Sequence, residues 1–210
     1  MSHYDDEDQA QRLKQWWKDN WKALAAGLVL GLSGIVGWEQ YKAHQSARGA
    51  EAARMFDDLK TALVTDKVEE ANAIADKLKT DFAKTPYAAQ GLMRIAQHAV
   101  EKSRFDEALP PLAWVAANAE DEALRPLAQL RQARVLAQQG KFDEALKLLD
   151  ASTEESYAAL AQELRGDILL AQGKRKDARD SFEKALTASD AAAANRETLQ
   201  RKIDDLADAA

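Results

Sequence analysis

The chain has 210 residues, a formal net charge of −6 and no cysteine. The lack of cysteine excludes a disulfide framework, a thiol nucleophile and a cysteine-ligated metal site. After residue 48 acidic side chains outnumber basic ones, which argues against nucleic-acid binding through a basic surface. Nine glycines and four prolines supply little turn chemistry for an all-β fold, so the Ala-, Leu-, Glu- and Lys-rich sequence predicts an all-α protein.

The first segment, residues 1–20, carries an acidic cluster of Asp5, Asp6, Glu7 and Asp8. Like charges at a terminus are usually solvated. We expect this segment to be a short cytoplasmic tail that becomes helical from about Gln9.

Residues 21–41 are predicted to form a single transmembrane helix. No charged residue occurs from Ala23 to Trp38, and Trp21 and Tyr41 flank this stretch with rings suited to the membrane interface. As a helix, 21 residues extend about 31 Å, which matches the hydrocarbon core of a bilayer. Contact with membrane lipid follows from this prediction.

Three alternative structures compete for the same stretch. A buried core helix or a helix lying in the membrane plane would need a polar face, which is absent. A cleaved signal peptide would need small residues at a cleavage site, whereas Trp38 is followed by Glu-Gln-Tyr. Basic residues slightly favour a cytoplasmic N-terminus and an external C-terminal domain, with Arg12, Lys14, Lys18 and Lys22 before the span and Lys42, Arg48 and Arg54 after it.

Gly27, Gly31 and Gly34 lie on one stripe of the predicted span. Such a stripe lets a second helix backbone approach closely, although glycine is also simply common in membrane helices. After the span, residues 42–64 contain no proline and are expected to continue as a helical junction.

Residues 65–210 contain about four related segments, which start at Asp66, Ser103, Gly140 and Gly173. Each begins with a turn residue and has alanine at its sixth position, at Ala71, Ala108, Ala145 and Ala178. A spacing near 34 residues predicts helical hairpins of the tetratricopeptide type, stacked as a solenoid. Small residues, Ala133 and Gly166, occur seven positions before the two turn glycines and are expected where paired helices approach each other.

The second segment contains Pro110 and Pro111, for which we expect a kink or a restart of its helix. A final helix from about residue 192 to Leu206 is expected to cap the last repeat.

Catalytic motifs, phosphate-binding loops and clustered histidines are absent from the sequence, which predicts a protein that is not an enzyme and has no metal or cofactor. The first helices of the hairpins should instead line a groove of mixed polar and apolar character for extended polypeptide. In it we expect Arg94, Arg131 and Arg134 to meet Glu163 and Asp167, either as simple surface ion pairs or as part of a binding surface. The candidate groove residues are Gln90, Met93, Arg94, Gln97, Leu130, Arg131, Arg134, Glu163 and Asp167.

The combination of the span "LGLSGIVGW…Y…H" (residues 30–44) with the repeats "LRQARVLAQQGKFDEAL" and "LRGDILLAQGKRKDAR" resembles the YfgM family of ancillary SecYEG translocon subunits. The resemblance covers nearly the whole chain. It implies a single-span inner-membrane protein with a periplasmic C-terminal domain and no catalytic residues. It also implies association with the SecYEG translocon and with a PpiD-type periplasmic chaperone, and a role in passing emerging, unfolded polypeptides to periplasmic chaperones.

A tetratricopeptide scaffold of the cell envelope or of the division machinery is the alternative, because the same repeats serve many interactions.

Overall fold

The computed structural model describes residues 3–151, 155–190 and 193–207, and these residues are all-α, as predicted. The helices are α1 (His3–Val64), α2 (Val68–Asp81), α3 (Pro86–Glu101), α4 (Phe105–Asn118), α5 (Leu124–Gln138), α6 (Phe142–Ala151), the 3-10 turn η1 (Glu155–Tyr157), α7 (Ala158–Ala171), α8 (Arg175–Ala188) and α9 (Arg196–Ala207). They form two units, residues 1–50 and residues 51–210.

The first unit consists of the N-terminal part of α1. Among the described residues, one helix is long and apolar enough to cross a membrane, and it is this one. None of its apolar window is buried within the protein, and Leu28, Leu30 and Ile35 are all exposed. An uncovered apolar helix of this length has the properties expected of the span predicted at residues 21–41.

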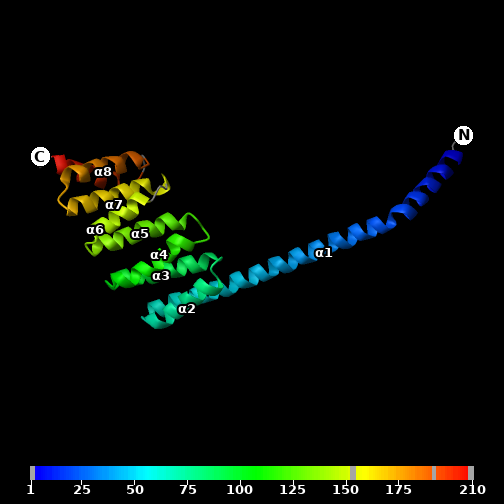
Figure 1. Cartoon of the computed structure of the whole chain (residues 1–210), viewed down its shortest axis with the longest axis horizontal. Coiled ribbons are helices and arrows are strands. Elements are labelled where there is room, and N and C mark those ends of the chain that lie inside the picture. The colour runs from blue at the N-terminus through cyan, green and yellow to red at the C-terminus, as the bar shows by residue number, and fades with distance from the viewer. Residues whose placement is uncertain (1–2, 152–154, 191–192, 208–210) are drawn as a thin grey trace. The chain divides into compact units, whose positions relative to one another are not determined.

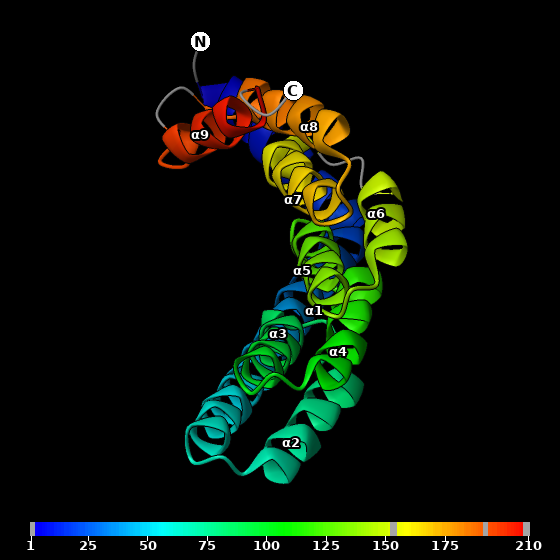
Figure 2. The ribbon, with the colours of Figure 1, turned by 90° about the vertical axis from the view of Figure 1, so that its left-hand side faces the viewer.

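The second unit is a stack of helical hairpins in chain order (Figure 1). The last turns of α1 pair with α2, and α3–α4, α5–α6 and α7–α8 follow. Figure 2 shows α3, α5 and α7 in succession along one side of the stack, with α4 and α6 along the other. Gly91 allows α3 to approach the first hairpin, because a Cβ there would lie 3.1 Å from Leu78 and 3.3 Å from Leu59.

The turn inside each hairpin has one geometry throughout. Each of the four turns spans three residues, with its middle residue in the left-handed region: φ is 57° at Asp66, 59° at Ser103, 74° at Gly140 and 77° at Gly173. The Ser103 amide donates to the Val100 carbonyl and the Arg104 amide to the Ala99 carbonyl, and the other turns repeat this pair of bonds. This is the Schellman motif, which satisfies carbonyls left unpaired at a helix end.

The small residues predicted at the helix contacts are buried there. Ala71, Ala108, Ala145 and Ala178 are each completely inaccessible to solvent, and Ala133 is too. Because alanine adds only a methyl group, the paired helices can approach closely along this line. The structure therefore confirms the repeat register read from the sequence.

Two expectations about the repeats need correction or refinement. Helix α4 does not restart at Pro110 and Pro111, which lie within one continuous helix. Packing compensates for the missing amide donors, since Leu112 and Val115 beyond the prolines are fully buried in the core. The capping helix α9 is present and begins at Arg196; residue 192, where we expected its start, lies outside the described residues. Its Leu199 packs with Phe182 of α8.

Candidate binding cleft

A cleft of about 500 Å³ lies between α3 and α5, above α4. Met93, Leu112 and Val135 form its buried apolar floor. Its rim is polar, with Gln97 and Glu101 from α3 and the two exposed arginines Arg131 and Arg134 from α5, together with Gln138. A mostly apolar cavity with a few convergent polar groups is the usual form of a binding site.

Helical periodicity explains how the two walls arise. On α3, Met93, Ala96, Gln97 and Val100 follow the spacing i, i+3, i+4, i+7. On α5, Arg131, Arg134, Val135 and Gln138 follow the same spacing. Each set therefore occupies one face of its helix, and the stacking of the hairpins brings the two faces together.

Four of the predicted groove residues meet in this cleft: Met93, Gln97, Arg131 and Arg134. Gln90 and Arg94 are exposed on α3 but lie outside the cleft, and the Arg94 guanidinium donates to Gln97 Oε1 at 3.2 Å. Leu130 does not line the cleft, because it is buried in the core shared by α5, α6 and α7.

The predicted meeting of the arginines with Glu163 and Asp167 does not occur. Both carboxylates instead pair with Lys202 of α9, whose Nζ lies 3.3 Å from Glu163 Oε1 and 2.7 Å from Asp167 Oδ1. Asn195 also donates to Glu163, at 3.0 Å. The prediction was wrong because it did not place α9, which packs on the last hairpin and supplies the nearer cation.

The pKa of Lys202 reflects this environment. Partial burial by itself would lower the pKa, but hydrogen bonds and charge from Asp167, and then from Glu163, outweigh it and raise the pKa above its ordinary value. Lys202 Nζ also lies 5.0 Å from the ring centroid of Phe182, a cation–π geometry. Lys202 therefore links α9 to α7 and offsets one of the two negative charges of Glu163 and Asp167.

The two cleft arginines are left without an acidic partner. Within residues 3–151, 155–190 and 193–207, neither Arg131 nor Arg134 makes an ion pair or a hydrogen bond. The cleft's one carboxylate, Glu101, accepts a hydrogen bond from Gln97 at 2.8 Å. The α5 wall of the cleft is therefore cationic on a chain whose net charge is −6.

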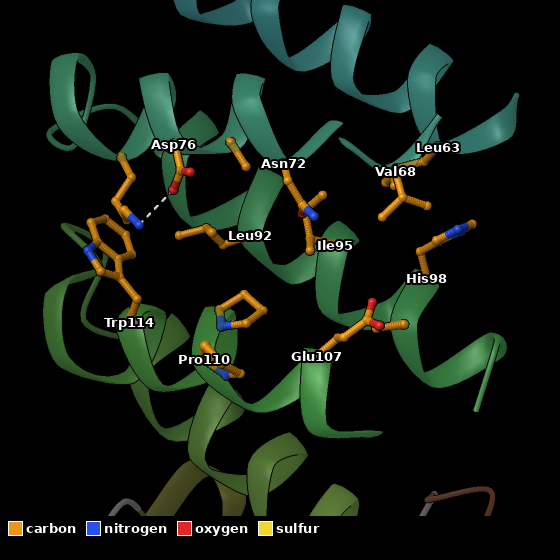
Figure 3. A pocket seen from close by; sticks show the side chains of 14 residues that line it. Leu63, Val68, Asn72, Asp76, Leu92, Ile95, His98, Glu107, Pro110 and Trp114 are labelled. Carbon is orange, nitrogen blue, oxygen red and sulfur yellow. Dashed lines mark hydrogen bonds and ion pairs between the residues drawn. The ribbon is translucent and has the colours of Figure 1, made fainter. Parts of the chain in front are cut away.

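A second cavity of about 420 Å³ opens on a different face of α3, between α2 and α4 (Figure 3). Leu92 and Ile95 form its floor, and Pro110 and Trp114 of α4 border it. At its edge Lys79 pairs with Asp76 at 2.8 Å, so this charge is satisfied internally. Pro110 and Pro111 of α4 therefore both line this cavity.

Sequence reasoning missed part of the cleft lining, including Val100, Glu101, Leu112, Val135 and Gln138. Val100, Val135 and Gln138 could have been predicted from the sequence, since the helical spacing that selects Met93 and Arg131 also selects them. Leu112 was not, because it reaches the cleft from the second helix of its hairpin. No group of three or more metal-binding side chains forms among the residues that the structure describes.

Comparison with known proteins places the chain. Residues 14–208 match the family model of the tetratricopeptide repeat-like domain. A protein of Escherichia coli (strain K12) named "Ancillary SecYEG translocon subunit" is 34% identical over 207 residues, which cover 98% of this chain and 99% of that protein. A Haemophilus influenzae protein of the same name is 33% identical over 181 residues, 86% of this chain and 88% of its own. The chain belongs to the family of ancillary SecYEG translocon subunits. The resemblance noted in the sequence is therefore confirmed.

A solved structure supports the fold independently. A Podospora anserina protein of nearly identical TPR-like repeats superposes with a TM-score of 0.55 at 17% identity, covering 77% of this chain and 87% of that protein. At that identity the likeness concerns the helical-hairpin solenoid alone.

Proposed function

We propose that the chain is a membrane-anchored, non-catalytic interaction subunit of the Sec translocon that helps pass exported polypeptides to periplasmic chaperones. The observation that carries this proposal is the full-length relation to proteins named ancillary SecYEG translocon subunits, a relation that spans both the apolar helix and the repeats. An uncovered apolar helix and a repeat domain with an open cleft on one chain are consistent with that role.

The proposed arrangement assigns residues 1–20 to the cytoplasm, 21–41 to the inner membrane, 42–64 to a junction and 65–210 to a periplasmic repeat domain. Gly27, Gly31 and Gly34 would form the surface for a neighbouring helix, because a Cβ at any of them meets nothing within 4 Å in this chain. The cleft between α3 and α5 would take polypeptide, and a PpiD-type chaperone is the proposed recipient.

The test uses photo-crosslinking residues in native membranes, with the adducts identified by mass spectrometry. One replaces Leu30 in the span, a second replaces Arg131 in the cleft, and a third replaces the exposed Lys184 on α8 as a control outside the cleft. We expect translocon subunits at Leu30, polypeptide or chaperone at Arg131, and neither at Lys184.

Two outcomes would contradict the proposal. Adducts at Leu30 only to copies of the same chain, with the protein concentrated at division sites, would support an envelope scaffold instead. Release of the protein from membranes by alkali, with no adducts at Leu30, would show that residues 21–41 are not an anchor.

A further inference from the structure

The unpaired arginines of the cleft indicate which polypeptides it takes. Arg131 and Arg134 are three positions apart on α5, so their side chains share one face of the helix. Buried Met93, Leu112 and Val135 lie below them. A ligand that satisfies both parts of this surface carries negative charge next to apolar groups.

We infer that the cleft selects extended polypeptide segments in which aspartate or glutamate side chains alternate with large apolar side chains. This specificity rests on the proposed function, since it names the class of polypeptide that the same cleft would bind. An arginine guanidinium matches a carboxylate through two parallel hydrogen bonds, and the apolar neighbours of that carboxylate would fill the floor of the cleft. The amide of Gln138 at the rim can bond to the backbone of an extended segment.

Competing carboxylates within the chain are already engaged elsewhere. Lys202 holds Glu163 and Asp167. Asp106 of α4 accepts a hydrogen bond from Gln139 at 2.8 Å and lies 3.8 Å from Lys141. These three acids therefore leave Arg131 and Arg134 available to a ligand.

The cleft's own carboxylate makes its two walls differ in charge. Glu101 belongs to the α3 wall, opposite the arginines on the α5 wall, and its bond from Gln97 fixes it there. A polypeptide segment therefore meets positive charge on one wall only. Segments with lysine in place of aspartate would face both arginines at close range and should bind poorly.

The experiment measures binding of short labelled peptides to the full-length chain in lipid nanodiscs by fluorescence anisotropy. The probe is Ser-Leu-Asp-Phe-Asp-Leu-Ser with both ends blocked, so that in an extended segment both aspartates lie on one side and the apolar side chains on the other. Its matched partners carry asparagine or lysine at both aspartates, and a fourth peptide carries asparagine but has a free C-terminal carboxylate. We expect the aspartate peptide to bind about tenfold more tightly than the asparagine peptide at low salt, with the difference shrinking as salt screens the exposed charges.

Variants separate charge from folding. In R131Q/R134Q the preference for the aspartate peptide should disappear, whereas R131K/R134K should retain only part of it, because both positive charges remain but the paired guanidinium hydrogen bonds are lost. The double variant R179Q/R201Q removes two exposed arginines outside the cleft and should behave as the unmodified chain. Thermal unfolding of each variant shows whether the repeat domain is intact.

Several results would overturn the inference. Equal binding of the aspartate and asparagine peptides would do so, as would a preference that survives R131Q/R134Q or is also lost in R179Q/R201Q. Tight binding only of the peptide with a free terminus would assign the arginines to chain ends instead of side chains. If Leu30 still crosslinks to the translocon in these cases, the proposed function stands and only the specificity fails.

Discussion

The ring of Phe182 in α8 occupies the space next to Gly166 in α7 that any side chain at position 166 would need. A Cβ there would lie 2.8 Å from ring atom Cζ and closer still to Cδ1 and Cε1. Phe182 is completely buried, so its ring has nowhere to move. The last hairpin therefore depends on glycine at this position for close packing, although the residue is helical.

Replacement of Gly166 by alanine should therefore destabilise the repeat domain. We expect a loss of about 1–3 kcal/mol, typical of overpacking in a filled core, measured by urea denaturation. The control is Gly49→Ala, also in a helix but with open space around the new methyl, which should cost nothing. Gly166→Ala should cost less in a Phe182→Leu background than in the unmodified chain, and an equal cost in both would contradict the packing explanation.

The turn residue Ser103 offers a stabilising change. Its φ of 59° is costly for a residue with a Cβ, and glycine occupies the equivalent place in two of the other turns. Ser103→Gly should raise the free energy of unfolding by about 0.5 kcal/mol, because relief of that strain slightly exceeds the extra entropy of glycine in the unfolded chain. Ser103→Ala keeps the strain and should bring no gain. An equal gain from alanine would show that the hydroxyl, and not the backbone, is the cause.

The fastening of α9 through Lys202 should be measurable by hydrogen exchange. Lys202→Met leaves Glu163 and Asp167 without their cation, so α9 amides should exchange faster and stability should fall by about 1 kcal/mol. Arg201→Met is the matched control, since among the described residues the Arg201 side chain bonds to Glu197 and Thr198, both in α9. Unchanged exchange in Lys202→Met would contradict the fastening role.

The same group makes a prediction at alkaline pH. Because the folded state raises the pKa of Lys202 above its ordinary value of 10.5, the stabilisation is fully present below that pH and disappears as the pH rises through the folded value. The difference in melting temperature between the unmodified chain and Lys202→Met should therefore narrow above pH 10.5 and nowhere in the neutral range.

The first turn should respond to acid. A hydrogen bond and charge from Lys102, and then a contact with His98, hold the pKa of Asp66 below its usual value of 3.8. The folded state therefore favours the carboxylate, and its contribution is present above pH 3.8 and lost as the pH falls through the lowered value. Asp66→Asn should be less stable than the unmodified chain at neutral pH and equal to it in strong acid. A constant difference across this range would exclude the charge as its cause.

Most of the fold could be predicted from the sequence because each repeat is marked by residues close together in the chain. The turn residues Asp66 and Ser103 and the buried alanines at the sixth positions follow from hairpin geometry, which any chain of this pattern must satisfy. The restart expected at Pro110 and Pro111 does not occur, because intrinsic helix preference is weaker than packing: α4 continues as one helix past both prolines.

The cleft was less predictable because it depends on contacts between distant parts of the chain. Helical spacing located Arg131 and Arg134 correctly, but which charges meet depends on tertiary distances. Glu163 pairs with Lys202, 39 positions away in a helix whose docking no local pattern specifies. Because Glu163 pairs with Lys202, it does not pair with Arg131 or Arg134, and the positive charge of the cleft remains.

The turns within the hairpins and the links between hairpins should differ in how well they tolerate a change in length. The turns inside the hairpins, residues 65–67, 102–104, 139–141 and 172–174, all contain three residues, whereas the links between helical pairs, residues 82–85, 119–123, 152–157 and 189–195, lengthen steadily along the chain. An inserted residue in a turn would break both hydrogen bonds of the Schellman motif, whereas the links already differ in length from one to the next. Evolutionary insertions, and epitope tags added by an experimenter, should therefore be accommodated in the links and rejected in the turns.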